Sequence, residues 1–443
     1  MTRIFSRVIV VLLTVLLIVG GVTLLPSCRE GDGEQVTLAK MDIIDATHLF
    51  IAPGSGNKLF KITETGYIQE VIYEDEVGSN VTMVEEPVAI YDVDSEYVIV
   101  CFGVNDIDIS EGYLVRKSSG AVFSLEDAGF PIPNTQREYN GFSTPAYFKN
   151  VEAVFTDSSG NIYYLAQSVG GVEIVKLNTQ STDSITKIGY SPSVDDVWIF
   201  IVDKDGNAAY LGCVKGDTSR TFARIRTAQG GIYDDVFDFH NPPWLGADGL
   251  IYWAYLGEAE PGHPEHPVVA VEKISINATS GVPTSSVYSV FEVEESVDLW
   301  IPGCHKLELQ GRVLLAQSVP KDHILELYNP ANSGRSLNIA AFNLSRLYSA
   351  VASDNFYYLH GSNSSTNEVL VKVDPTDDSY TALLSTDEYC IYTMSTSSSD
   401  ELIFNALRMS DGVNVIGKFD VSGNLTILDE ESDVEMVVLE RIQ

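Results

Sequence analysis

The chain is poor in basic residues. Its 27 Lys and Arg stand against 62 Asp and Glu, which gives a net charge of −35 over 443 residues. A surface with this excess of carboxylates repels phosphate backbones, so we expect no nucleic-acid partner. Cationic ligands remain compatible with it. Hydrophobic residues are not scarce: they make up 45% of the chain, which excludes a disordered protein.

The sequence also lacks the short motifs that mark several enzyme classes. It contains no G-x-S-x-G, no H-E-x-x-H, no G-x-x-x-x-G-K-[ST] and no G-x-G-x-x-G after a strand. Scattered carboxylates can still assemble an active site, so these absences disfavour an enzyme rather than rule one out. We expect no cofactor.

The first residues have the pattern of an export segment. Arg3 and Arg7 precede an apolar run from Val8 to Leu25, and no acidic residue occurs before Glu30. The run is longer than a usual signal core and just long enough for a membrane-spanning helix of about 18 residues. Both interpretations place the rest of the chain outside the cytoplasm and hold it at a membrane.

The stretch Leu25-Pro26-Ser27-Cys28 resembles a bacterial lipobox, with Pro26 as its departure from the favoured pattern. The resemblance implies a lipoprotein signal peptide over residues 1–27 and lipid attachment at Cys28. Residues 28–39 would then be a short tether. The alternative is an uncleaved anchor helix.

One short strand recurs through the remaining chain: two apolar residues, a basic one, an apolar one and a polar one. LFKIT at 59, IVKLN at 174 and LVKVD at 370 are copies. The basic position returns at intervals of 46 to 60 residues. The eight marker positions are Lys61, Arg116, Lys176, Arg224, Lys273, Glu326, Lys372 and Lys418.

Each marker has similar neighbours, which the third unit shows plainly. VEAVFTD, IYYLAQ, IVKLN and SITKIGY read as four short strands rich in β-branched and aromatic residues. YIQEVIY at 67 is the expected fourth strand of the first unit. Four-stranded units of this length are propeller blades. We therefore predict an all-β fold, an eight-bladed β-propeller of four-stranded antiparallel blades over residues 40–443, with seven blades as the alternative. The tail from Val434 is expected to close the ring.

The D-x-x-G-N-I-Y hairpin at Asp157 and the turns TETGYIQ, KSSGAVF and DVSGNLT resemble those of quinoprotein-like and NHL-like propellers, a superfamily with bacterial lipoprotein members. The resemblance covers residues from about 40 to 430 and concerns the fold. The closing Trp of the quinoprotein repeat is absent, so quinone chemistry is not implied. The S-x-D-x-G-x-x-W box of sialidase-like propellers is absent too. Eight-bladed membrane-assembly lipoproteins share the plan, which implies a scaffold role.

Four further cysteines, Cys101, Cys213, Cys304 and Cys390, fall in units two, four, six and eight. No two of them lie in neighbouring blades, whereas a disulfide needs Cα atoms within about 7 Å. We expect all four to be buried and unpaired.

In a propeller, the connection from strand two to strand three and the link to the next blade emerge on one face. The longest insertions, residues 102–112, 126–150 and 256–267, all fall on that face. Long polar or aromatic loops on a rigid scaffold are typical of a binding surface, although neutral lengthening produces the same picture. The candidate ligand residues are Asp106, Asp108, Arg137, Tyr139 and Glu258.

Two stretches contain potential metal ligands. His263 and His266 with Glu260 form the densest such set, but a solvated Pro-rich loop explains them as well. Asp203-x-Asp205-Gly206-Asn207 resembles the beginning of a calcium loop, yet its twelfth position is Val214 instead of Glu. A hairpin turn explains this stretch better.

Together these features predict an exported, membrane-anchored propeller lipoprotein of the cell envelope. We expect a monomeric, non-catalytic binding or scaffolding module for a protein or a glycan. The alternative is an extracytoplasmic hydrolase or lyase that acts on carbohydrate.

Overall fold

The structure is a computed structural model. The chain divides into two units, Met1–Thr37 and Leu38–Gln443, and all described residues lie in the second, which begins two residues before the expected boundary at 40. Among them, no helix is long and apolar enough to cross a membrane. The structure describes residues 38–442 except 53–55, 84, 105–108, 131–132, 134–153, 169–170, 179–185, 189–195, 215–216, 235–242, 246–247, 259–266, 278–279, 293–307, 310–311, 318–323, 330–331, 366, 385–387 and 432–437.

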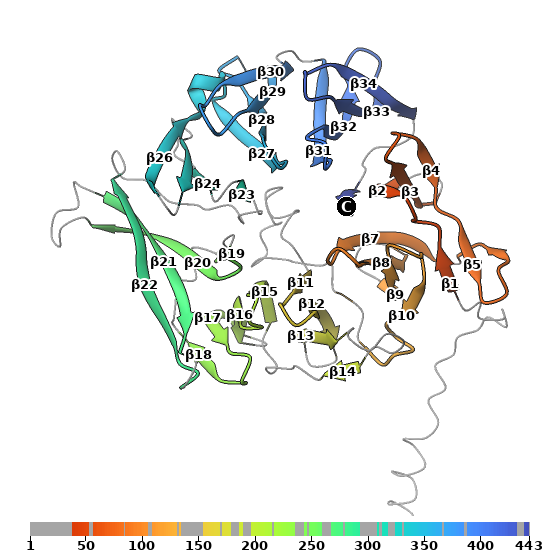
Figure 1. Ribbon diagram of the computed structural model, residues 1–443, viewed down its shortest axis with the longest axis horizontal. Helices are drawn as coiled ribbons and strands as arrows, with labels where there is room; N and C mark the ends of the chain where they lie inside the picture. Colours follow the sequence, from red (N-terminus) through yellow and green to blue (C-terminus); the bar gives the residue numbers. More distant parts are fainter. Residues whose placement is uncertain are drawn as a thin grey trace, which may run out of the picture. The chain divides into compact units, whose positions relative to one another are not determined.

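Eight four-stranded antiparallel sheets follow one another in chain order around this second unit (Figure 1). Blade 1 contains β35 (Val438–Arg441), β2 (Ala46–Ala52), β3 (Lys58–Thr63) and β4 (Ile68–Glu70). Blade 2 contains β7 (Glu86–Asp92), β8 (Tyr97–Gly103), β9 (Ile109–Arg116) and β10 (Val122–Ser124). Blade 3 contains β11 (Val154–Thr156), β12 (Asn161–Ser168), β13 (Gly171–Asn178) and β14 (Thr186–Ile188). Blade 4 contains β15 (Asp196–Val202), β16 (Ala208–Val214), β17 (Asp217–Arg226) and β18 (Ile232–Asp234).

The second half of the chain repeats this order. Blade 5 contains β19 (Trp244–Leu245), β20 (Ile251–Glu258), β21 (Pro267–Ile276) and β22 (Pro283–Glu292). Blade 6 contains β23 (Glu308–Leu309), β24 (Arg312–Gln317), β25 (Ile324–Asn329) and β26 (Asn332–Asn338), followed by the 3₁₀ turn η2 (Ile339–Phe342). Blade 7 contains β27 (Arg346–Ala352), β28 (Tyr357–Ser362), β29 (Glu368–Val373) and β30 (Tyr380–Leu384). Blade 8 contains β31 (Tyr389–Thr396), β32 (Leu402–Arg408), β33 (Val413–Phe419) and β34 (Leu425–Glu431). The predicted all-β, eight-bladed propeller is confirmed.

The C-terminal strand β35 closes the ring as the first strand of blade 1. It runs antiparallel to β2, with Val438 opposite Ile51 and Arg441 opposite His48. Ile442, just beyond β35, is buried, and its backbone N–H donates to the carbonyl oxygen of Thr47 at 3.0 Å. The role predicted for the tail is therefore confirmed in its described part.

The repeated marker residue lies in the third strand of every blade, as its register predicts. In five blades a tyrosine of the second strand is its cross-strand partner: Tyr97 with Arg116, Tyr163 with Lys176, Tyr210 with Arg224, Tyr252 with Lys273, and Tyr358 with Lys372. The Nζ atom of Lys176 lies 5.3 Å from the ring centroid of Tyr163, a cation–π contact. The ammonium group of the marker thus lies over an aromatic ring of the neighbouring strand.

Two of the basic markers also form ion pairs with carboxylates in turns. Lys273 Nζ lies 2.6 Å from Asp248 Oδ2, and Lys418 Nζ lies 2.9 Å from Glu401 Oε1. Each pair joins the third strand of a blade to the turn that precedes the second strand of the same blade. In these blades the basic marker therefore has a physical role: its cation offsets part of the acidic charge of the neighbouring turn.

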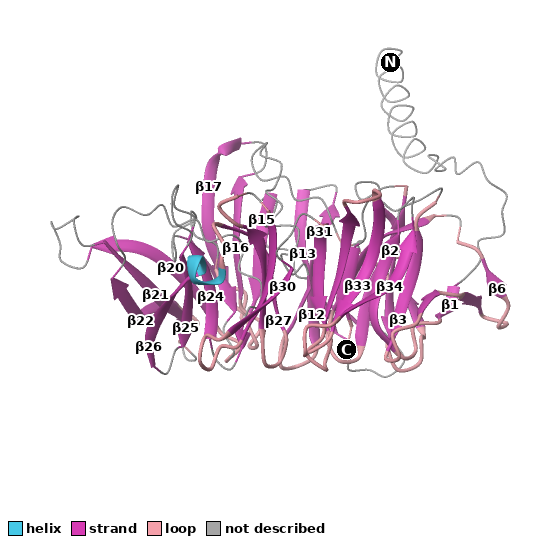
Figure 2. Ribbon diagram, turned by 90° about the horizontal axis from the view of Figure 1, so that it is seen from above, coloured by secondary structure: helices cyan, strands magenta, loops and turns pink. Residues whose placement is uncertain are grey.

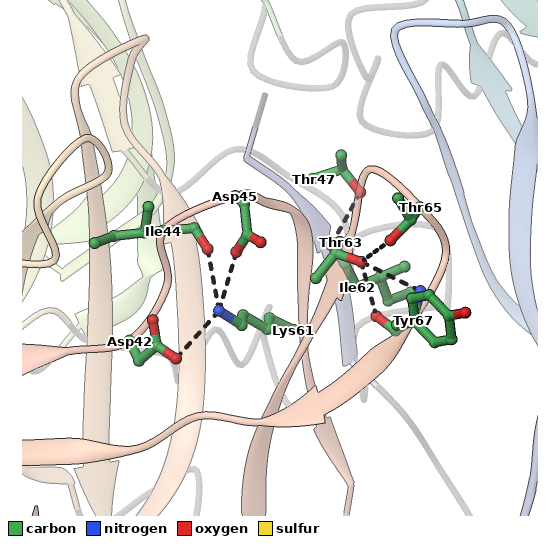
Figure 3. Close-up of polar contacts among 9 residues, drawn as sticks. All are labelled: Asp42, Ile44, Asp45, Thr47, Lys61, Ile62, Thr63, Thr65 and Tyr67. Atoms are coloured by element: carbon green, nitrogen blue, oxygen red, sulfur yellow. Dashed lines mark hydrogen bonds and ion pairs between the residues drawn. The ribbon is translucent and has the colours of Figure 1, made fainter.

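Lys61, the marker of blade 1, is buried, with only 3% of its surface exposed. Figure 3 shows its ammonium group surrounded by Asp42, Ile44 and Asp45. Its ammonium group donates to the carbonyl oxygen of Ile44 and to Asp45 Oδ1, both at 3.0 Å, and lies 3.2 Å from Asp42 Oδ2. All three acceptors belong to the segment that precedes β2. Lys61 therefore fastens the N-terminal segment of the unit to blade 1.

Short turns between strands one and two, and between strands three and four, line one edge of the sheets (Figure 2). We call this edge the hairpin face. At Asp203, Oδ1 accepts the backbone N–H groups of Asp205 and Asn207, and Oδ2 accepts Nδ2 of Asn207. Asp157 binds its own turn in the same way. The structure therefore confirms a hairpin at Asp203 rather than a calcium loop.

One predicted strand is wrong. YIQEVIY divides into β4 and β5 (Tyr73–Asp75), and β5 leaves blade 1 for a separate three-stranded sheet with β1 (Leu38–Met41) and β6 (Asn80–Val81). The chain turns away at Val71, which is buried, and the backbone N–H of Asp42 then donates to the carbonyl oxygen of Ile72. The β1 segment supplies this second partner, which no repeat pattern indicates.

Cys101 and Cys390 are free, as predicted, and lie in blades 2 and 8. Cys101 is fully buried, whereas Cys390 is only partly buried, so the expected burial is wrong for Cys390. Cys390 is the second residue of the inner strand β31, between the buried Tyr389 and Ile391, so its side chain lies on the less buried side of this strand end. Cys304, like the side chain of Cys213, lies outside what the structure describes.

Candidate functional site

The residues proposed from the sequence lie almost entirely outside the described part of the chain. These are Cys28, Asp106, Asp108, Arg137, Tyr139, Glu260, His263 and His266. Glu258 is described through its backbone alone, as the last residue of β20. They remain predictions. The described residues contain no group of three His, Cys, Asp or Glu that could hold a metal ion.

The strands do show where the insertions begin and end. The connection from β8 to β9, that from β20 to β21 and the link from β10 to β11 all lie at the edge opposite the hairpin face. We call it the linker face. The first connection covers only residues 104–108, not 102–112, because Phe102 is buried and pairs with Glu111 inside the ladder.

On the linker face, a cluster of polar side chains that the structure describes lies in blade 7. His360, near the end of β28, is buried between side chains of the two neighbouring strands. Its Nδ1 lies 3.2 Å from Ser349 Oγ in β27, and its Nε2 contacts Glu368 Oε2 at the beginning of β29. An ionised carboxylate only accepts, so Nε2 donates to Glu368, while Nδ1 and the Ser349 hydroxyl are hydrogen-bonded to each other.

Tyr348 extends this cluster toward solvent. Its hydroxyl donates to Ser362 Oγ at 2.9 Å, and its ring meets the His360 ring edge-to-face, with centroids 5.5 Å apart. We call Tyr348, Ser349, His360, Ser362 and Glu368 the blade 7 cluster. Both ring nitrogens of His360 have hydrogen-bond partners, so the side chains of the blade 7 cluster are held in place without a ligand.

Tyr348 occupies a special backbone position. The pairing of β27 with β28 skips from Leu347 to Ser349, which makes Tyr348 a β-bulge. The same skip occurs in the inner strands of three other blades, where the extra residue is Val88, Trp198 or Tyr392. A bulge bends its strand and re-aims one side chain, so β27 and β31 turn Tyr348 and Tyr392 out of the regular alternation.

Cys390 lies close enough to Glu368 to feel its charge, but it is not an activated thiol. Burial and the Glu368 carboxylate both raise the pKa of the Cys390 thiol. A raised pKa keeps the sulfur protonated at neutral pH, whereas a nucleophilic cysteine needs its thiolate. The cluster therefore offers a hydroxyl, an imidazole and a carboxylate.

Those three groups form a proton-relay chain of the kind that activates a serine. The backbone around Ser349 argues for a positional role instead: Ser349 is paired with His360 in the β27–β28 ladder, directly after the bulge at Tyr348, and its partner nitrogen is Nδ1. A strand residue held in a ladder does not project as a nucleophile on a sharp turn does. The arrangement fits binding better than acyl transfer.

The sequence interpretation missed this cluster. Ser349, His360 and Glu368 come from three strands and have no motif spacing, and only the antiparallel register brings them together. One signal was present: a large residue stands at the same distance before the hairpin turn in several units, as Trp198, Tyr348 and Tyr392 do. Aligning the units on their hairpins reveals it.

No protein-family model matches the chain, and neither does any curated protein. Solved structures resemble it only at the level of a β-propeller-like fold. A puromycin hydrolase is 14% identical, with a TM-score of 0.44, over 79% of this chain and 54% of its own, so the chain spans about half its length. A putative 6-phosphogluconolactonase from Bacteroides uniformis is 11% identical, with a TM-score of 0.42, over 89% and 100%. The dihydro-heme d1 dehydrogenase NirN is 10% identical, with a TM-score of 0.46, over 94% and 77%. At this distance the likeness carries no functional argument.

Proposed function

We propose that the protein is an exported, membrane-anchored propeller that binds a protein or a glycan at its linker face without catalysing a reaction. Lipidation of Cys28 would provide the anchor. Its net charge of −35 would repel anionic lipids, so the surface of the propeller would stay away from the membrane and remain accessible to a ligand.

The difference between the two faces carries this proposal. On the hairpin face the carboxylates of Asp157 and Asp203 accept hydrogen bonds from their own turns, and neighbouring turns bind each other. For example, the backbone N–H of Ser158 donates to the carbonyl oxygen of Lys204. The linker face carries the uneven connections, among them 125–153, together with the blade 7 cluster. Long loops on a rigid frame are where proteins place binding residues.

Site-specific photo-crosslinking tests the proposal. A photoreactive residue is placed at Tyr139 or Asp106 for the linker face, and at Tyr67 or Val282, which are exposed in hairpin turns, for the other face. We expect a discrete crosslinked species from the linker-face positions only. Crosslinks that arise equally from Tyr67 and Val282 would contradict the proposal.

A second function has one observation in its favour. The Ser349–His360–Glu368 chain contains the residue types of a hydrolase relay. An extracytoplasmic hydrolase acting on carbohydrate or carbohydrate esters would lose its turnover in the Glu368→Gln variant. Turnover of a glycan panel by the full chain, abolished by that substitution, would place this function ahead of binding alone.

A further inference from the structure

Two tyrosines lie exposed on inner strands whose other described side chains are buried or partly buried. Tyr348 is 37% exposed and Tyr392 is 39% exposed, whereas Ala350 and Ile391 beside them are buried. Both tyrosines are bulge residues, and their strands, β27 and β31, contact each other in adjacent blades. The fold therefore presents two aromatic rings at equivalent positions near the linker-face ends of neighbouring inner strands.

The first ring is held in place. The Tyr348 hydroxyl is bonded to Ser362, and its ring edge is set against His360, which Ser349 and Glu368 hold in turn. A ring fixed before binding loses little conformational freedom when a ligand stacks on it. A tyrosine exposed only because it lacked a packing partner would not need such support.

Polar groups lie beside the Tyr348 ring, because the His360 ring that it meets contacts both Ser349 and Glu368. Ser349 and Glu368 are each partly exposed. Glu368 contacts His360 through Oε2, and a carboxylate has room for about four hydrogen bonds in all. The site thus combines flat apolar faces with hydroxyl and carboxylate groups at their edge. A pyranose ring, which has C–H faces and a rim of hydroxyl groups, matches that combination.

We propose that Tyr348 and Tyr392 form a stacking subsite for a neutral or cationic sugar ring, with Ser349 and Glu368 as hydrogen-bonding partners for its hydroxyl or amino groups. The proposal rests on the proposed function and names its ligand class. The Glu368 carboxylate and the net charge of −35 disfavour anionic saccharides.

Calorimetric titration of the full chain tests this subsite with four trisaccharides: cellotriose, chitotriose, its deacetylated form and trigalacturonate. We expect at least one of the first three to bind and trigalacturonate not to bind. Tyr348→Ala and Tyr392→Ala should each weaken binding about tenfold or more, as loss of an aromatic contact does. Tyr348→Phe keeps the ring and should weaken binding less. Tyr67→Ala removes a tyrosine that is more exposed than either, at 69%, from the hairpin face and should have no effect.

The proposal is overturned if no saccharide binds, or if binding survives both alanine substitutions in variants that unfold at the wild-type temperature. Its failure is distinguishable from failure of the proposed function. Crosslinks from Tyr139 or Asp106 to a protein, without saccharide binding, would leave a linker-face binding module and remove only the sugar subsite.

Discussion

His48 and Arg441 face each other across the strand pair that closes the ring. His48 is completely buried, its Nε2 lies 3.2 Å from the carbonyl oxygen of Thr396 in blade 8, and its Nδ1 lies 3.0 Å from Thr47 Oγ1. The histidine thus stands where β2, the closing strand β35 and the inner strand β31 of blade 8 meet. Its protonation state bears directly on ring closure.

Acid is expected to loosen this closure. Burial above all, and the Arg441 charge, lower the pKa of His48 to about 4, against the opposing effect of the Thr396 carbonyl. Unfolding restores a pKa near 6.5, so the unfolded chain takes up the proton first. The stability contribution is complete above pH 6.5 and falls as pH drops toward 4, by at most about 1.4 kcal/mol per pH unit. Urea unfolding of the wild type and the His48→Gln variant from pH 7.5 to 4.5 isolates the contribution of His48, because the other titrating groups are common to the two proteins. Parallel pH profiles would show that His48 is not responsible.

Removal of the closing strand should destabilise the whole unit. A chain that ends at Asp433 keeps β34 and loses β35, which exposes one edge of β2 and the buried environment of Ile442. We expect a free-energy loss of more than about 2 kcal/mol and aggregation through the open edge. Thermal unfolding and light scattering measure both. A peptide of residues 434–443 added in excess should restore part of the stability, and a truncated chain that melts like the full one would contradict the prediction.

Lys61→Met should cost about 1–3 kcal/mol of unfolding free energy, because it removes the donor that Ile44, Asp42 and Asp45 share. The matched control is Lys58→Met. Lys58 pairs with Glu70 at 2.9 Å, but both side chains are more than half exposed, at 57% and 53%. Its loss should change stability by less than about 0.5 kcal/mol. Chemical denaturation compares the two variants, and equal effects would mean that the burial of Lys61 does not matter.

Gly206→Ala should destabilise the contact between blades 3 and 4. Gly206 has φ of +81°, and a Cβ atom there would lie 2.7 Å from Tyr163 Oη and 3.1 Å from Asp157 Oδ2. Gly230→Ala is the control: its φ is +90°, yet a Cβ atom would meet nothing within 4 Å. Backbone strain of about 1 kcal/mol is expected in both, and an additional loss in Gly206→Ala alone. Tyr163→Phe should relieve that additional loss in the double variant.

The residue pattern by itself determined the repeating unit. Alternating apolar and polar residues define each strand, turn residues such as Asp157 and Asp203 separate strands, and the basic marker sets one register for all blades. These signals are local, since each depends on residues a few positions apart. They were therefore readable without coordinates, and they were sufficient for the blade count and for a closing role of the tail.

Tertiary structure decided what depends on contacts between distant strands. The departure of β5 to join β1 requires a partner more than thirty residues away. The blade 7 cluster requires the register of β27 against β28 and of β28 against β29 to bring Ser349, His360 and Glu368 together. The exposure of Tyr348 and Tyr392 arises from a bulge, which is a mismatch between two strands and not a property of either one. A single extra residue in a ladder leaves no signature within its own strand and shows only when the units are aligned on their hairpins, yet it determines which side chains the inner strands expose to solvent.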